Sequence, residues 1–151
     1  PVFPNAQYVI IGEEWAYWRA AIETDSPDER PIIALIERAG LRIIAMNEEI
    51  FPGLTAFPIP GHTPGQIAVT LESHGETLIH LADLLHTPMQ FAHPEWSPRF
   101  DHDVSVSVPT RRAALERAAD QKARVMFYHL PFPGVGEITR TGGTFAWHSV
   151  E

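Results

Sequence analysis

Short apolar runs separated by proline and glycine are the feature that most restricts the fold of this chain. The sequence holds 14 prolines and 10 glycines, and many of them stand between apolar runs. Runs of this length suit β-strands, which need only about five residues to cross a sheet. Helical segments alternate with these strands, and no linker, repeat or low-complexity tract interrupts the pattern. We therefore predict a single layered α/β (α+β) unit.

Individual elements follow from hydrophobic periodicity and from residues that start or stop helices. Ser26 is a candidate N-cap, Pro27 suits a first helical turn, and Gly40 is a candidate left-handed C-cap. Helices are expected at residues 13–22, 26–39 and 109–123. Strands are expected at residues 8–11, 41–46, 54–59, 66–72, 77–83, 124–128, 137–140 and 144–150. Residues 73–76 join two strands as a hairpin, and residues 91–103 form an irregular segment.

Charge and cysteine content exclude several classes of protein. The chain carries 11 Lys and Arg against 19 Asp and Glu, a formal net charge of −8, which argues against nucleic acid as a partner. The absence of cysteine excludes disulfides, thiolate metal sites and a cysteine nucleophile. No apolar stretch approaches the roughly 20 residues of a membrane span, so no membrane partner is expected. The first residues show no signal-peptide pattern, which favours a cytoplasmic location.

Three side chains that can bind metal ions stand at the ends of expected strands. His62, Asp83 and His129 each come where an apolar run stops and a turn begins. Loops at strand ends are where an α/β scaffold presents its functional residues. Neutral imidazole and carboxylate are ligands that Zn²⁺ or a similar divalent ion accepts. Each residue alone has a structural explanation, such as Asp83 capping the next segment, but together they predict a metal site.

The segments around these residues resemble the later motifs of the metallo-β-lactamase superfamily. The motifs are PGHTPGQI around His62, HLADLLH around Asp83 and FYHLPFPGVG around His129, in the order of that family. HLPFPG and the later GGTFAW are most similar to the branch that contains methyl parathion hydrolase and lactonase-like enzymes. The resemblance covers essentially the whole chain, because residues 2–18 also resemble the strand and helix that follow the family's first metal motif.

The resemblance implies the C-terminal half of an αββα sandwich. It also implies a hydrolase of esters, lactones or phosphotriesters that uses two divalent ions, with zinc as the expected metal. In the family's pattern His62 binds the first metal, His129 binds the second, and Asp83 bridges both. Such ions polarise the scissile carbonyl or phosphoryl group and activate a water molecule. Gly61 would allow the tight turn that brings His62 to the metals.

The family's leading motif, H-x-H-x-D-H, is absent from the sequence. We therefore expect an N-terminally truncated portion of a longer protein, which keeps three of the usual ligands and is inactive alone. The missing half would cover the apolar faces of strands such as residues 66–72 and 77–82. We accordingly expect either a homodimer or association with the missing N-terminal segment. The alternative is a non-catalytic, metal-poor remnant of the fold that associates through open sheet edges.

Acid–base and substrate-binding residues are less well defined by the sequence. His86 is a candidate to give or take a proton, and the alternative, which the sequence favours, is a surface histidine or one that supports a ligand. Phe91 and Trp96, with Phe132 opposite, are candidates to line an apolar pocket for a small-molecule substrate. Core packing explains each of these aromatic residues equally well.

Overall fold

The computed structural model describes residues 3, 5–24 and 27–150, which form two compact units. Unit 1 is Pro1–Met46 and unit 2 is Asn47–Glu151. Both units combine strands with helices, as the α/β prediction requires. The assignment of the whole chain to one domain stays a prediction.

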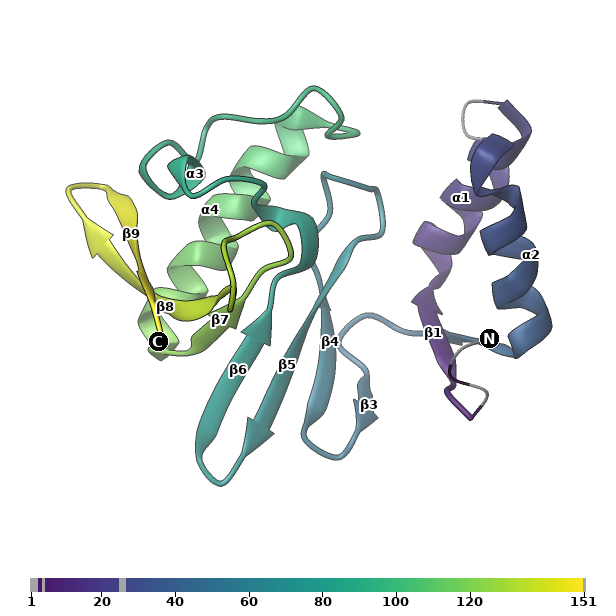
Figure 1. The fold of residues 1–151 in the computed structure, drawn as a ribbon, viewed down its shortest axis with the longest axis horizontal. Helices are drawn as coiled ribbons and strands as arrows, with labels where there is room; N and C mark the ends of the chain where they lie inside the picture. Colours follow the sequence, from purple (N-terminus) through teal and green to yellow (C-terminus); the bar gives the residue numbers. More distant parts are fainter. Residues whose placement is uncertain (1–2, 4, 25–26, 151) are drawn as a thin grey trace. The chain divides into compact units, whose positions relative to one another are not determined.

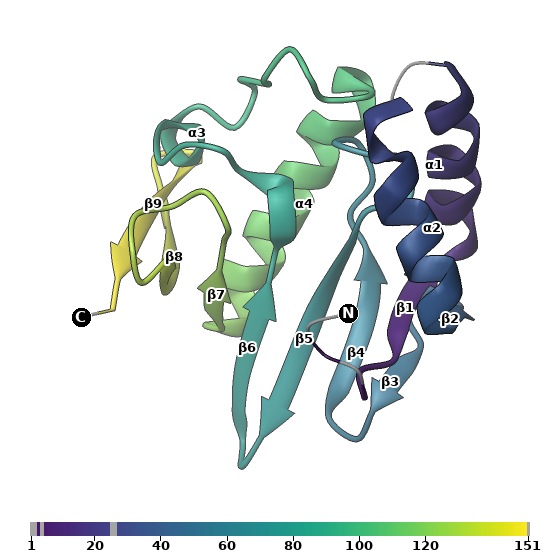
Figure 2. The same cartoon turned by 45° about the vertical axis from the view of Figure 1, so that its right-hand side comes forward.

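Unit 1 is a strand–helix–helix–strand arrangement. Its elements are β1 Tyr8–Ile11, α1 Gly12–Thr24, the 3₁₀ turn η1 Pro27–Glu29, α2 Arg30–Ala39 and β2 Leu41–Ile44. Strands β1 and β2 pair in parallel, and α1 and α2 lie side by side (Figures 1 and 2). The predicted C-cap of α2 is confirmed, because Gly40 has a φ of 87° in the left-handed region. The predicted N-cap, Ser26, lies outside the described residues.

Unit 2 is built around one sheet. Its elements are β3 Glu49–Phe51, β4 Leu54–Pro58, β5 Ile67–Ser73, β6 Glu76–His80, η2 Ala82–Leu84, α3 Met89–Ala92, α4 Val104–Gln121, β7 Arg124–Met126, β8 Val135–Thr141 and β9 Thr144–Ser149. Within the described residues, the strands form a seven-stranded sheet in the order β3 to β9. Neighbouring strands are antiparallel, except that β6 and β7 are parallel. Helix α4 makes the crossover between β6 and β7 and lies behind the sheet in Figure 1.

The core of unit 2 lies between α4 and one face of this sheet. Ala114, Leu115 and Ala118 form a buried stripe along α4 and belong to the same apolar cluster as sheet residues. Ile79 of β6 and Val125 of β7 are among these sheet residues, and they are direct neighbours in the sheet. Spacing of three and four residues places a stripe of this kind on one side of a helix.

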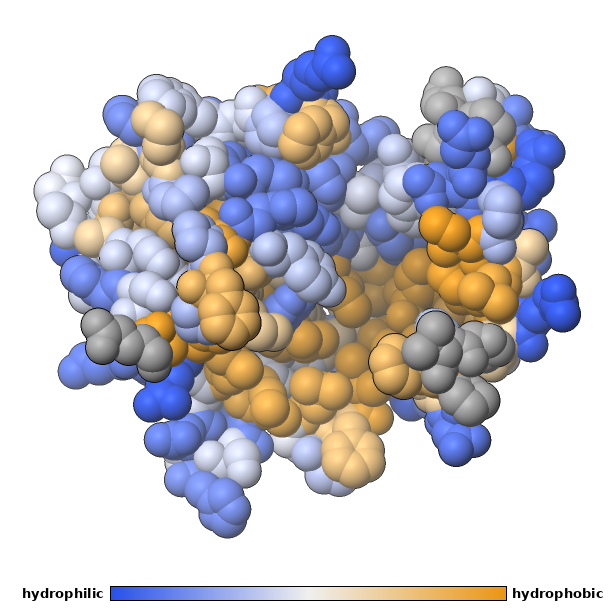
Figure 3. All heavy atoms as spheres, in the orientation of Figure 1, coloured by the Kyte–Doolittle hydropathy of each residue, from blue (hydrophilic) through white to orange (hydrophobic). Residues whose placement is uncertain are grey.

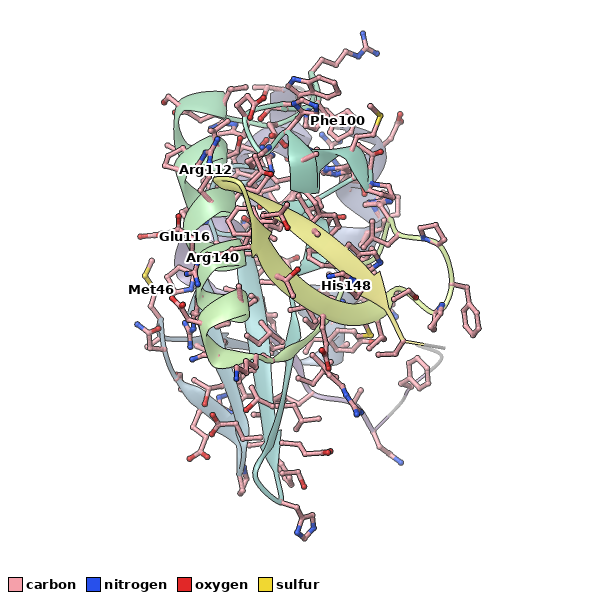
Figure 4. All side chains as sticks on the ribbon, turned by 90° about the vertical axis from the view of Figure 1, so that its left-hand side faces the viewer. Met46, Phe100, Arg112, Glu116, Arg140 and His148 are labelled. Carbon is pink, nitrogen blue, oxygen red and sulfur yellow. The ribbon has the colours of Figure 1, made fainter. Side chains whose placement is uncertain are left out.

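Polar contacts at the surface join α4 to β8 as well. Arg140 of β8 donates to the Asp120 carboxylate at 2.6 Å and to the backbone oxygen of Glu116 at 3.4 Å. Figure 4 shows Arg140 beside Glu116 on the outer side of α4.

The opposite face of the sheet is apolar and open. Leu54, Leu71 and Leu78 are direct neighbours across β4, β5 and β6, and they alternate with the residues that face α4. Leu71 is 45 % exposed. In Figure 3, apolar residues gather over these three strands. A hollow of about 270 Å³ on this face is lined by Leu71, Leu78 and Val135, among others. At Leu71 this apolar face is therefore exposed to solvent.

Several boundaries differ from the expected ones. Helix α4 begins at Val104 instead of residue 109, because the Asp103 carboxylate caps it by accepting the N–H of Ser105 at 2.8 Å. Strand β6 ends at His80 and not at Asp83, since the chain enters the 3₁₀ turn η2 first. Strand β3 and the short helix α3 were not expected. No helix in the described part of the chain is long and apolar enough to cross a membrane.

Candidate metal centre

Three strand ends meet at one edge of the unit 2 sheet. β4 and β6 both run antiparallel to β5, and β7 runs parallel to β6. The carboxyl ends of β4, β6 and β7 therefore lie at the same edge. His62, Asp83 and His129 follow these three ends in turn. The sheet topology thus explains why residues far apart in the sequence come together.

Four side chains meet at this edge, and we call them the His–Asp cluster: His62, Asp83, His86 and His129. Ligand atoms of His62, Asp83 and His86 all lie within 4.8 Å of one another. His129 Nε2 lies 2.8 Å from Asp83 Oδ1, and the His129 ring stacks on the His86 ring at a centroid distance of 4.7 Å. The predicted convergence of His62, Asp83 and His129 is therefore seen, and His86 joins them. Their assignment as metal ligands stays a prediction.

The donor set of the His–Asp cluster fits a divalent metal ion. Burial and, to a smaller extent, the neighbouring His62 and His129 lower the pKa of His86 to about 4, against the opposing effect of Asp83 and Asp101. The His86 ring is therefore neutral at neutral pH. Among the described residues its buried Nδ1 has no hydrogen-bond partner, a state that a buried polar atom rarely keeps. Neutral imidazole nitrogens beside a carboxylate are the ligands that zinc accepts.

Contacts with the start of α4 hold the turn that carries His62. The N–H of His102 donates to the backbone oxygen of His62 at 3.1 Å, and the N–H of Asp103 donates to that of Gly61 at 3.0 Å. Gly61 has a φ of 134°, and a Cβ at this position would lie 2.3 Å from Ser107 Cα. Glycine is required here by its backbone angle, and also by the close approach of α4, which the sequence did not reveal.

Asp101 and Arg111 lie behind His62, and the sequence analysis missed both. Asp101 Oδ1 lies 3.1 Å from His62 Nδ1, and Asp101 Oδ2 accepts from Arg111 Nη2 at 3.2 Å. Both side chains of this ion pair are only 1 % exposed. The sequence did hold one indication that Arg111 is buried: it stands three residues before Ala114 and four before Leu115, on the buried stripe of α4.

Gln66, which the sequence analysis also missed, links two loops of the site. With the amide in the orientation that satisfies both groups, its oxygen accepts from the backbone N–H of Asp83 at 3.1 Å and its nitrogen donates to the backbone oxygen of Ile59 at 3.3 Å. The side chain is buried. Gln66 thereby connects the turn before β5 to the turn that presents Asp83.

The structure corrects one of the proposed substrate-binding residues. Phe91 is 2 % exposed, belongs to the core, and stacks on Trp147 at a centroid distance of 5.4 Å. Its interpretation as a pocket wall is wrong, because core neighbours already cover the ring. Trp96 stacks on His93 at 4.2 Å, and Phe132 is 98 % exposed. The substrate-binding roles of Trp96 and Phe132 stay predictions.

Another aromatic residue lies against the His–Asp cluster. The Phe100 ring is 4.9 Å from the His86 ring and 5.7 Å from the His62 ring, in both cases edge to face. Phe100 is more than half exposed, so its ring forms an apolar wall next to the cluster. It lies in the segment expected to be irregular, where no periodicity marks a residue as buried or functional.

Comparisons with known proteins give structural matches. No protein-family profile matches the chain, and no curated protein matches its sequence. AidC, described as a dizinc quorum-quenching lactonase in complex with a product, is 30 % identical with a TM-score of 0.86, and the match covers 99 % of this chain and 56 % of AidC. AbOPH, described as a hydrolase in the beta lactamase superfamily, is 23 % identical with a TM-score of 0.82, over 99 % of this chain and 56 % of AbOPH.

A third match has the same character. A probable metal-dependent hydrolase from Staphylococcus aureus is 22 % identical with a TM-score of 0.77, over 97 % of this chain and 53 % of that protein. The chain thus spans about half the length of the structures that it matches. These likenesses confirm the fold that the sequence motifs led us to expect.

Proposed function

We propose that this chain supplies part of the metal centre of a metal-dependent hydrolase. The premise is that it has the fold of metallo-β-lactamase superfamily hydrolases. The observation that carries the proposal is the convergence of His62, Asp83 and His86 within 4.8 Å, with His129 hydrogen-bonded to Asp83. In this proposal His62, Asp83 and His129 hold the metal, and zinc is favoured because AidC is described as a dizinc enzyme. Bound divalent ions would polarise the scissile group and activate water.

The residues of the chain have distinct parts in this proposal. The two carboxylate oxygens of Asp83 allow it to contact two ions, whereas His62 and His129 would each present one ring nitrogen. His86 is the proposed acid–base residue, because its ring lies between those of His62 and His129 and is free to exchange a proton through a ring nitrogen. Phe100, edge to face with His86, would exclude water from one side of the substrate.

Lactones, esters or phosphotriesters are the proposed substrate class, and the description of AidC as a lactonase favours lactones. The chain spans about half of AidC, so we expect the 151-residue chain alone to hydrolyse an acyl homoserine lactone or an aryl phosphotriester only at background rate. The longer protein should be active with metal and inactive after chelation. Robust metal-dependent turnover by the 151-residue chain would contradict its being a fragment.

His62→Ala and His129→Ala should each abolish that metal-dependent activity in the longer protein. His74→Asn is a matched control, because His74 is an exposed histidine that follows the far end of β5, a strand of seven residues that spans about 20 Å. Asparagine tolerates the positive φ of 51° at this position. Equal activity of all three variants would refute the assignment of the metal ligands.

Association through the open sheet face is the final part of the proposal. Exposed Leu71 and its half-buried neighbours Leu54 and Leu78 support it, because apolar area left in water costs roughly 25 cal/mol per Å². We propose that further chain of the same protein covers this face, since the chain spans about half of its structural matches. Size-exclusion chromatography with intact mass spectrometry tests this on the 151-residue chain. A dimer would favour self-association instead, and a stable monomer of 16.9 kDa would show that no cover is needed.

A non-catalytic remnant of the fold remains the rival function. Metal analysis of the purified, unchelated protein separates the two, because the enzyme would retain a divalent metal and the remnant would not.

A further inference from the structure

We propose that Asp101 and Arg111 are positioning residues, which fix the ring of His62 and the turn of Asp83 for metal binding. The inference rests on the proposed function in one respect, namely that His62 and Asp83 are metal ligands. The pair itself is an observation about the chain: a buried carboxylate and a buried guanidinium meet directly behind the His–Asp cluster.

Asp101 uses both of its carboxylate oxygens. Oδ1 lies 3.1 Å from His62 Nδ1, while Oδ2 accepts from Ser107 Oγ at 2.9 Å and from Arg111 Nη2 at 3.2 Å. Oδ2 thus faces a hydroxyl donor and the guanidinium of Arg111, which stays protonated in proteins, and the two side chains form a buried ion pair. The carboxyl group is therefore ionised at neutral pH.

An ionised carboxylate can only accept hydrogen bonds, which determines the state of the His62 ring. Nδ1 must carry the proton that it donates to Asp101, so in the neutral ring the lone pair lies on Nε2. A ring nitrogen with a free lone pair is what a metal ion needs, and a carboxylate on the other nitrogen fixes the orientation of the ring. Asp101 thus selects both the tautomer and the direction of His62.

Arg111 connects this carboxylate to the other side of the site. Its Nε donates to the backbone oxygen of Leu84 at 2.9 Å, and Leu84 directly follows Asp83. Its Nη1 donates to the backbone oxygens of Pro94 and Trp96 at 2.8 and 2.9 Å. One guanidinium therefore holds the turn after Asp83 and the carboxylate behind His62. A lysine has no planar fork and cannot make this set of contacts.

Asp101→Asn tests the proposal in the 151-residue chain. Asparagine keeps the shape and one acceptor oxygen, so the contact with Arg111 can persist, but the carboxylate that selects the tautomer is lost. In the metal-free wild type, two-dimensional ¹⁵N NMR of the histidine rings should show His62 protonated on Nδ1. In the variant the ring should shift toward a mixture of tautomers, and the zinc dissociation constant should rise about 10- to 100-fold.

Asp103→Asn is the matched control. Asp103 lies two residues further on and caps α4 through Ser105, and asparagine is an equally good cap. It should change neither the His62 tautomer nor the zinc affinity. Ser107→Ala, which removes one donor to Asp101 without touching His62, should act in the same direction as Asp101→Asn but more weakly, and it replaces that variant if the latter does not fold.

The two readouts separate this inference from the proposed function. One outcome is that the wild-type chain binds no zinc, while His62 shows the Nδ1 tautomer and loses it in Asp101→Asn. That result would refute the proposed function and support the role of Asp101. If neither Asp101→Asn nor Ser107→Ala changes the tautomer of His62, the positioning role of Asp101 is overturned, whatever the zinc affinity.

Discussion

The two ends of the His–Asp cluster are built in different ways. His62 is held by backbone hydrogen bonds to the start of α4 and by the buried pair of Asp101 and Arg111. His129 has a side chain that is 47 % exposed, and its contacts are the Asp83 carboxylate and the stacked ring of His86. One end is fixed by the fold of this chain, and the other is fixed chiefly by the cluster itself. The chain therefore orders half of the site before any metal binds.

Arg111→Met should have the largest effect, on the well-held end. It leaves the Asp101 charge buried without its cation, which costs about 3–5 kcal/mol of the free energy of unfolding. Arg112→Met is the matched control, because Arg112 is 40 % exposed and its ion pair with Glu95 lies at the surface, where water and salt screen such a pair. Urea denaturation measures the free energy of unfolding of both variants. Equal decreases would mean that the buried pair of Asp101 and Arg111 does not fix the His62 end of the cluster.

Gly61→Ala should also destabilise the His62 end. The new Cβ would lie 2.3 Å from Ser107 Cα at a φ of 134°, so strain and overpacking together should cost about 2–4 kcal/mol. Gly142→Ala serves as the control, since Gly142 has a φ of 54° and nothing within 4 Å of the added atom. Thermal unfolding should show a large decrease in Tm for the first variant and a small one for the second.

Replacing each histidine compares the two ends directly. His62→Ala leaves a buried oxygen of Asp101 without its donor, which should cost about 1–3 kcal/mol of stability. His129→Ala, at an exposed position, should change stability by only about 0.5 kcal/mol. Both variants should weaken zinc binding. If His129→Ala were as destabilising as His62→Ala, the two ends would be equally well fixed by the fold.

Removing the exposed ion pair of Asp120 and Arg140 should have the smallest effect on stability. The hydrogen bond from Arg140 lowers the pKa of Asp120, so any stabilisation by this pair is present above the ordinary pKa of an aspartate and is lost as the pH falls through the lowered value. Asp120→Asn should therefore leave Tm at pH 7 nearly unchanged. A large change would show that exposed pairs contribute as much here as the buried one.

The sequence predicts the well-patterned parts of the molecule. Apolar runs predict most strands, Gly40 predicts the end of α2, and the hairpin expected at residues 73–76 joins β5 and β6. The positions of His62, Asp83 and His129 at strand ends also predict that they lie close together, because strands that run in the same direction have their carboxyl ends at the same edge of a sheet. Helix α4 begins five residues before the expected residue 109, because Asp103 is the actual cap and Pro109 lies inside the helix.

The support for His62 was not predictable in the same way. Asp101 lies in an irregular segment, where no period distinguishes an inward side chain from an exposed one. Arg111 does fall on the buried stripe of α4, but an arginine on an apolar stripe is ordinarily assumed to reach solvent. Two roles stayed open for Phe91 for a related reason: an aromatic residue in an irregular segment can line a pocket or enter the core, and only the tertiary structure distinguishes these.

A crystal structure of the chain grown with zinc, with an anomalous difference map at the zinc edge, tests the central claim most directly. A peak is expected about 2.0–2.2 Å from His62 Nε2 and from an Asp83 oxygen, with a further ligand from His129. Asp101 should remain on His62 Nδ1. Zinc bound only at other histidines, such as His74 or His148, or no peak between His62 and Asp83, would contradict it.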